Sequence, residues 1–145
     1  MYSENYSRQT ALAGAERARA PETTDHELAA LGRSEEVMVR ATVAERVETP
    51  LTVLLKLAED DATSVRAGLA RNEREDLPLE VREGLAKDKA PEVQLALVRN
   101  PAAPNSVIVT LSHSRQRDIA NVARKRLSEQ GAKAAILGRV GIATS

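Results

Sequence analysis

Apolar residues recur along the chain in a pattern that repeats about every 26 residues. Four times a Leu is followed eight residues later by Val or Ile, and three of these Leu residues have a Pro seven residues before them. The Leu residues are Leu31, Leu57, Leu85 and Leu111, and the Pro residues are Pro50, Pro78 and Pro104, with Thr24 in the same place before Leu31. The chain is therefore expected to contain four copies of one structural unit, beginning at 24, 50, 78 and 104.

Each unit predicts two short helices joined by a polar turn. In the second unit, apolar residues follow helical spacing over 53–58 and again over 65–70, with the acidic turn 59–61 between them. A proline at the start of a unit favours the first helical position, where its missing N–H has no partner to lose. Helices of about ten residues are not stable alone, and stacking neighbouring units buries both apolar stripes. The pattern predicts an all-α solenoid, and the alternative is a plain helical bundle in which the periodicity is accidental.

Some positions depart from the repeat. Two extra residues lie in the connection 73–77, which we interpret as a surface turn. Arg82 stands where the second unit has Leu54. Gly68 and Gly84 lie inside helical patterns, where glycine costs about 1 kcal/mol relative to alanine. For both glycines we expect a neighbouring helix to approach closely.

The repeated motif is Leu-Ala-x-Asp, then Val-Arg-x-x-Leu-Ala-x-Asn, then a Pro that opens the next helix. Its copies include Leu57-Ala58-Glu59-Asp60 with 65–72, Leu85-Ala86-Lys87-Asp88 with 93–101, and a weaker copy at 39–44. Over about 24–127 the chain resembles the leucine-rich repeat variant family, and more distantly it is similar to HEAT-type arrays. The resemblance implies α and 3₁₀ helices alternating in a right-handed superhelix. Some relatives bind an iron–sulfur cluster through an N-terminal Cys cluster, but this chain has no Cys, so no cofactor is expected.

Three segments follow from this interpretation. Residues 1–22 are polar and are expected to be either flexible or a capping helix over 9–19. Residues 23–130 form the repeat domain, and 131–145 form a C-terminal tail that docks on the last repeat or binds a partner. Met1–Arg8 lacks the apolar run of a signal peptide, and no stretch approaches the roughly 20 apolar residues of a membrane helix. We expect a bacterial protein of the cytoplasm, without a membrane span.

Composition excludes several kinds of chemistry. The chain has no Cys, Trp or Phe, so thiolate metal sites, Cys nucleophiles and aromatic stacking platforms in the repeats are absent. His26 and His113 are the two histidines. His26 lies in Thr24-Asp25-His26-Glu27, whose spacing predicts a capping box, and His113 follows Ser112 without an evident orienting acid. We expect neither a metal site nor an enzyme.

Charge is distributed unevenly although the formal net charge is zero. Residues 1–90 carry 13 Lys or Arg and 18 Asp or Glu, whereas residues 91–145 carry 8 and 3. This asymmetry is compatible with solubility alone, with head-to-tail self-association of an acidic end and a basic end, or with a phosphate-binding patch. The patch would consist of Arg115, Arg117, Arg124, Lys125 and Arg126.

The leading functional hypothesis is a non-enzymatic repeat-protein adaptor that binds a protein partner, because solenoids present extended surfaces. The candidate partner-binding residues are Arg40, Arg66, Arg71 and Arg99. For Arg40 and Arg66 a structural alternative is pairing with an acid in the turn between helices, such as Asp60 or Asp61. The alternative function is nucleic-acid binding through the basic C-terminal repeat.

Overall fold

The computed structural model describes residues 2–144, with side chains over 4–138, and this part of the chain consists of helices joined by turns, without strands. The all-α prediction is therefore confirmed. The helices are α1 (Tyr2–Arg19), α2 (Asp25–Leu31), α3 (Val37–Glu45), α4 (Leu51–Leu57), α5 (Thr63–Arg71), α6 (Leu79–Ala86), α7 (Pro91–Val98), α8 (Asn105–Leu111) and α9 (Arg117–Thr144).

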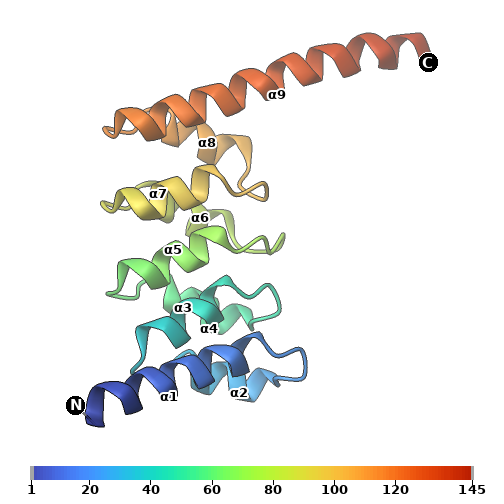
Figure 1. Cartoon of the computed structure of the whole chain (residues 1–145). Helices are drawn as coiled ribbons and strands as arrows, with labels where there is room; N and C mark the ends of the chain where they lie inside the picture. The colour runs from blue at the N-terminus through green and yellow to red at the C-terminus, as the bar shows by residue number, and fades with distance from the viewer. Residues whose placement is uncertain (1, 145) are drawn as a thin grey trace.

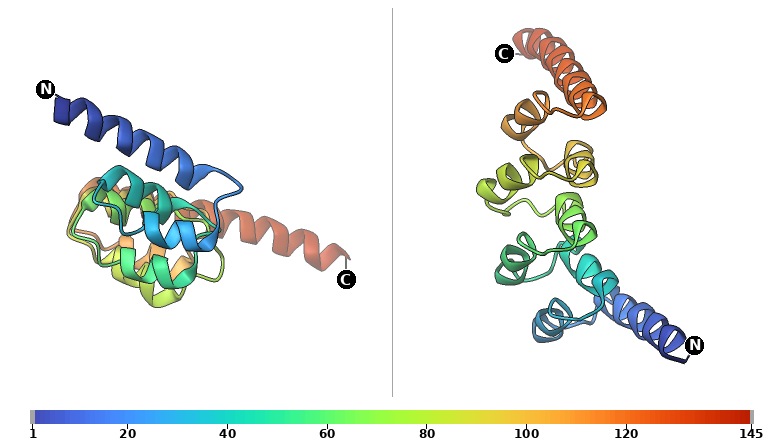
Figure 2. Two further views of the ribbon diagram at one scale, coloured as in Figure 1. Left: turned by 90° about the horizontal axis from the view of Figure 1, so that it is seen from below. Right: turned by 90° about the vertical axis from the view of Figure 1, so that its left-hand side faces the viewer.

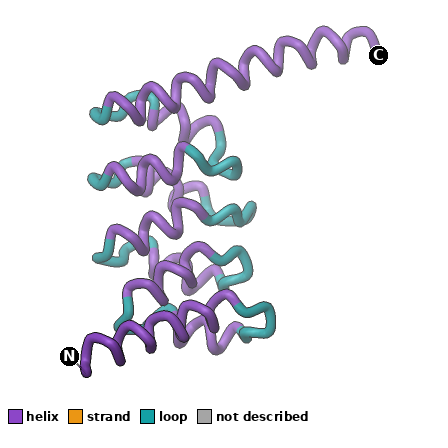
Figure 3. The backbone as a smooth tube through the Cα atoms, viewed as in Figure 1, coloured by secondary structure: helices purple, strands orange, loops and turns teal. Residues whose placement is uncertain are grey.

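The helices form a two-layer, repeat-like stack. The odd-numbered helices lie side by side in one layer from α1 to α9, and α2, α4, α6 and α8 form the second layer (Figures 1 and 2). The turns gather along the two edges of the stack (Figure 3). The turns that lead from an even-numbered to an odd-numbered helix lie along one edge. The turns that lead from an odd-numbered to an even-numbered helix lie along the other. Residues far apart in the sequence therefore meet at regular intervals along each edge.

The core lies between the two layers and is built from the periodic apolar positions. Of the four repeated Leu residues, those of the last three units are buried, and all four β-branched residues eight positions later are buried. These buried residues are Leu57, Leu85 and Leu111, and Val39, Val65, Val93 and Ile119. Because each helix buries one stripe against the next pair, the short helices are stabilised by stacking.

Two details of the helices differ from expectation. Pro50, Pro78 and Pro104 are N-caps, so α4, α6 and α8 begin one residue later. The reason is that the proline carbonyl accepts the first helical hydrogen bond, as Pro50 does from Leu54 N–H at 3.1 Å. The even-numbered helices are also α-helices and not 3₁₀ helices, since they keep bonds four residues apart, such as Ala58 N–H to the Leu54 carbonyl.

The two terminal helices project beyond the stack in opposite directions (Figure 2). Helix α1 covers most of the polar N-terminal segment and buries Ala11, Ala15 and Ala18, in contact with α3. Helix α9 continues through the boundary expected at 131, and residues 131–138 are exposed and do not dock on the last repeat. Residues 1 and 145 of the two expected end segments lie outside the described part. Within that part, no helix combines the length and hydrophobicity needed to cross a membrane.

Candidate functional site

One edge of the stack carries a ladder of Arg–Asp pairs between neighbouring repeats. Arg40 Nε lies 2.8 Å from Asp60 Oδ2, and Arg66 Nε lies 2.7 Å from Asp88 Oδ2. Each Arg also donates to backbone carbonyls of the turn before its own helix, as Arg66 does to Asp60 O at 2.7 Å. Each Asp accepts a further bond from the backbone N–H two residues later. The ladder therefore joins each turn to the next repeat.

The third pair of this ladder consists of uncharged residues. Gln94 takes the place of Arg and donates to the carbonyls of Ala86 and Asp88, both at 3.0 Å. Ser114 takes the place of Asp and donates to Gln94 Oε1 at 2.7 Å. Ala120 occupies the next equivalent position, where the stack ends. Arg is therefore absent at position 94 because a Gln–Ser pair replaces the Arg–Asp pair. It is absent at position 120 because the ladder ends there.

The pairing changes the titration of the two aspartates. Burial tends to raise the pKa of Asp60, but hydrogen bonds from Arg40 and from Ala62 N–H, together with nearby Arg charges, outweigh burial and lower it. The pKa of Asp88 is lowered by the same balance, with Arg66 and Ala90 as donors.

We expect the ladder to make stability depend on acid pH. A lowered carboxyl pKa contributes stability that is present above the ordinary value of about 4 and is lost as the pH falls through the lowered value. Asp60→Asn should lower the free energy of unfolding at pH 7 by about 1 to 2 kcal/mol. The double variant Asp60→Asn, Asp88→Asn should then lose less stability than the parent between about pH 5 and pH 2. Urea unfolding at several pH values measures this, and parallel pH curves for both proteins would contradict it.

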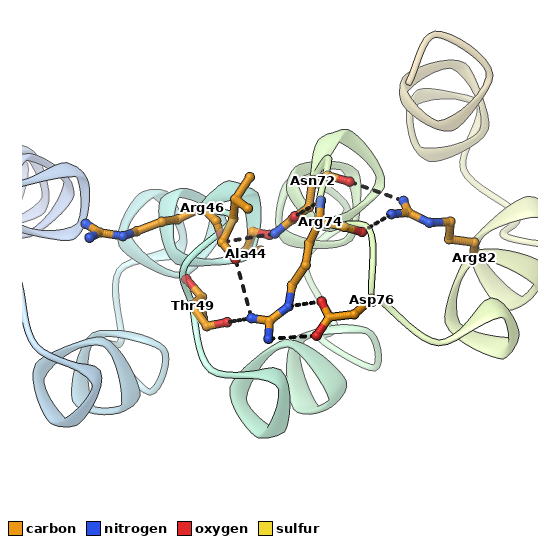
Figure 4. Close-up of polar contacts among 8 residues, drawn as sticks. Ala44, Arg46, Thr49, Asn72, Arg74, Asp76 and Arg82 are labelled. Carbon is orange, nitrogen blue, oxygen red and sulfur yellow. Dashed lines mark hydrogen bonds and ion pairs between the residues drawn. The ribbon is translucent and has the colours of Figure 1, made fainter. Parts of the chain in front are cut away.

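The opposite edge carries a second ladder, made by buried amides. Asn72 Nδ2 donates to the carbonyls of Ala44 and Arg46 at 2.9 and 3.0 Å (Figure 4). One repeat later, Asn100 Nδ2 donates to those of Ala70 and Asn72 at 2.9 and 2.7 Å. Each asparagine therefore satisfies two carbonyls at the end of the preceding odd-numbered helix. Its Oδ1 accepts the N–H two residues later and shapes the following turn.

Arginines occupy the same position at the two ends of this amide ladder. Arg46 donates to the carbonyls of Ala18 and Ala20, which joins α1 to the stack. Arg126 donates to the carbonyls of Val98, Asn100 and Ala103 at 2.7 to 2.9 Å. Burial lowers the pKa of Arg126. Its guanidinium therefore holds α9 on α7, and this use removes Arg126 from the expected phosphate patch.

The two-residue insertion has its own arginines. Arg74 pairs with Asp76 and donates to the carbonyl of Thr49, so the longer turn is tied to the previous one (Figure 4). Arg82 is buried among core positions and donates to the carbonyls of Asn72 and Arg74 at 3.2 and 2.6 Å. Burial lowers the pKa of Arg82. An arginine thus replaces a core leucine in the unit with the longer turn, where it is a donor to the Arg74 carbonyl and a second donor to the Asn72 carbonyl.

The ladders leave few of the expected partner-binding residues available. Arg40 and Arg66 use their guanidinium donors within the chain, which is the structural alternative considered for them. Arg71 is half-exposed and lies 3.3 Å from Glu45, and Arg99 is exposed. The other residues of the expected phosphate patch remain exposed, namely Arg115, Arg117, Arg124 and Lys125.

The layer of even-numbered helices contains a groove between α4 and α6 with a volume of about 460 Å³. Its apolar side chains include Leu55, which is exposed, and Val81. Carboxylates border it, and none of the residues that line it is Lys or Arg. The lining residues are Leu55, Ala58, Glu59, Glu80, Val81, Gly84, Leu85 and Asp88. We call this the α4–α6 groove.

Gly84 faces the groove, and the expected close approach of a helix is wrong for it. A Cβ built on Gly84 meets no atom within 4 Å, whereas a Cβ built on Gly68 would lie 2.7 Å from the Ala41 carbonyl oxygen. Gly68 is therefore required by the crossing of α3 and α5, and Gly84 is required by no contact within the described structure. The residues at the equivalent positions of the neighbouring units, Lys56 and Thr110, are polar. The sequence therefore already indicated that this position faces away from the core.

The two histidines lie apart from one another, and the structure shows what each of them contacts. His113 Nδ1 lies 2.9 Å from the Val109 carbonyl, and the Ser112 hydroxyl donates to the same carbonyl, so this pair is engaged locally. His26 is exposed beside the capping box of Thr24 and Glu27, which is confirmed. The described residues hold no group of three His, Asp or Glu side chains placed to bind a metal ion.

Comparisons with protein-family models, curated proteins and solved structures give no match for this chain.

Proposed function

We propose that the stack is an α-solenoid of about four helix pairs of the leucine-rich repeat variant type, and that it is a protein-binding module. In this proposal the partner binds in the α4–α6 groove. The two ladders on the edges hold the repeats in register, and the layer of short helices presents the binding surface. No chemistry beyond binding is required of the site.

The observation that carries this proposal is the position of Gly84. A glycine inside a helix costs about 1 kcal/mol relative to alanine, and no neighbouring atom of the described structure requires one there. Its missing side chain instead keeps open the wall that α6 contributes to the groove. A residue that destabilises its helix, and that no contact within the protein explains, is expected where a ligand occupies the space.

The lining of the groove indicates the chemistry of the partner. Leu55, Ala58 and Val81 offer apolar contact, while Glu59 and Glu80 carry negative charge at the rim. Asp88 also lines the groove, but its charge is balanced by Arg66. The complementary ligand is a protein segment with apolar and basic side chains, such as an amphipathic basic helix.

The test is a binding titration with two labelled helical peptides that share Leu and Ala positions and differ only in having Lys or Glu. We expect the Lys peptide to bind and the Glu peptide not to bind. Gly84→Gln places a long side chain in the groove and should weaken binding at least tenfold, a change of about 1.4 kcal/mol. Gly84→Ala is the matched control, since it gives the same helix benefit and leaves most of the space open. Equal binding by both variants would place the site elsewhere.

A second candidate function is nucleic-acid binding, favoured by a basic surface at the turns of the last two units. Lys87, Lys89, His113 and Arg115 line a depression of about 510 Å³, close in sequence to the exposed Arg117 that begins α9. Labelled duplex DNA forms the other arm of the titration. Affinity that falls steeply with salt and is unchanged by Gly84→Gln would support this candidate over the groove.

A further inference from the structure

Helix α9 carries a segment that has no partner within the described structure. Residues 131–138, which we call the projecting segment, are all exposed and lie beyond the side of the stack (Figures 1 and 2). Ile136 and Leu137 are 62% and 59% exposed. Adjacent large apolar side chains on an exposed helix commonly mark an interaction surface.

The chemistry of this part of α9 matches the α4–α6 groove. Residues 131–145 include two basic residues, Lys133 and Arg139, and no acidic residue. The groove has carboxylates and no basic residue among those that line it. Most other residues of the projecting segment are Gly or Ala, which keep a helix thin enough to approach a groove closely.

The projecting segment cannot reach the groove of its own chain. Helix α9 is continuous to Thr144 and leaves the stack sideways at its end (Figure 1). The groove lies between α4 and α6, and α8 packs on α6 between the groove and α9. The groove that this segment can enter therefore belongs to another molecule.

We propose that the projecting segment of one copy binds in the α4–α6 groove of a second copy. This inference rests on the proposed protein-binding function and names the partner of that site. Each copy offers one segment and one groove, so the contact is heterologous and extends to chains or closed rings. The contact is small, and we expect reversible association that grows with protein concentration.

This contact differs from the pairing of an acidic end with a basic end. The first helix, α1, carries Glu4 and Glu16 but also Arg8, Arg17 and Arg19, so α1 itself has no excess of negative charge. The exposed carboxylates Glu59 and Glu80 lie instead in the middle of the stack, at the groove. Charge complementarity therefore favours the groove over α1 as the site for a basic segment.

Sedimentation velocity on the full chain at concentrations up to about 1 mM tests this proposal. Two variants each remove one side of the contact. Ile136→Glu with Leu137→Glu makes the projecting segment polar and acidic, and Gly84→Gln fills the groove. We expect the parent protein to associate and each variant to remain monomeric. Leu12→Glu, on the exposed side of α1, is the control and should associate like the parent.

Mixing the two variants gives the decisive result. The Gly84→Gln protein keeps an intact segment and the segment variant keeps an intact groove, so we expect a dimer with one copy of each and no larger species. Monomers in the mixture, or association of Gly84→Gln like that of the parent, would overturn the proposal. A parent protein that stays monomeric yet binds the Lys peptide would also overturn it, while leaving the protein-binding function intact.

Discussion

Replacing Asn100 with Ala is expected to lower the free energy of unfolding by about 3 kcal/mol. The substitution leaves the carbonyl of Ala70 without its donor and the N–H of Ala102 without its acceptor, and the carbonyl of Asn72 keeps only its longer bond from Arg82. Asn100 is buried, and each buried polar group left unsatisfied costs about 1 to 3 kcal/mol. Urea unfolding followed by circular dichroism measures the change, and the melting temperature should fall by about 10 °C.

Two further variants sharpen this result. Asn100→Asp keeps the oxygen that accepts from Ala102 but places a second oxygen against the two carbonyls, so it should be at least as destabilising. Arg99→Ala alters the exposed neighbour and should change stability by no more than about 0.5 kcal/mol. A loss below about 1 kcal/mol for Asn100→Ala would mean that the amide ladder contributes little to the stacking of repeats.

The helices and their repeat-like spacing were predictable because they depend on local sequence intervals. The eight-residue interval from Leu57 to Val65, with Pro50 seven residues before, places one apolar stripe on each of two helices. Burial of these positions needs only that neighbouring pairs stack. The helix start was shifted by one residue, since a proline N-cap and a proline at the first helical position give the same sequence pattern.

The ladders were less visible because they depend on how neighbouring repeats are offset. In the sequence Asn72 is the last residue of the repeated motif, and its two carbonyl acceptors lie 26 and 28 residues earlier. Arg82 was seen to replace a core leucine, but its partners are carbonyls of a turn lengthened by insertion. In the amide ladder 26 to 30 residues separate each asparagine from its carbonyl acceptors, and in the Arg–Asp ladder 20 and 22 residues separate the partners. These intervals are known only once the helix pairs are stacked.

The candidate site was placed differently for a related reason. Arg40 and Arg66 recur at one position, which is compatible either with a binding surface or with cohesion between repeats. Their bonds to Asp60 and Asp88 assign them to cohesion. No other unit has a glycine at the position equivalent to Gly84. From the sequence, close approach of a neighbouring helix was expected for Gly84 as for Gly68. Only the distances around a built Cβ separate the two glycines.

The two glycines lead to a prediction of opposite sign for one substitution. Gly68→Ala should destabilise the protein by about 2 kcal/mol, and Gly84→Ala should stabilise it by about 1 kcal/mol. At Gly68 the new methyl group would lie 2.7 Å from the Ala41 carbonyl oxygen, a backbone atom that cannot rotate away. Helices α3 and α5 must then separate. At Gly84 the methyl group meets nothing within 4 Å, and only the gain in helix propensity remains.

Comparison of the two variants isolates packing, since the gain in helix propensity is similar at both sites. Urea unfolding of Gly68→Ala, Gly84→Ala and the double variant measures it. The two glycines lie on α5 and α6 and share no contact through a built Cβ, so their effects should add within about 0.5 kcal/mol. Stabilisation by Gly68→Ala would mean that α3 and α5 cross at a larger distance. Destabilisation by Gly84→Ala would mean that the groove is filled by part of the chain itself, and the observation that supports a binding function would be lost.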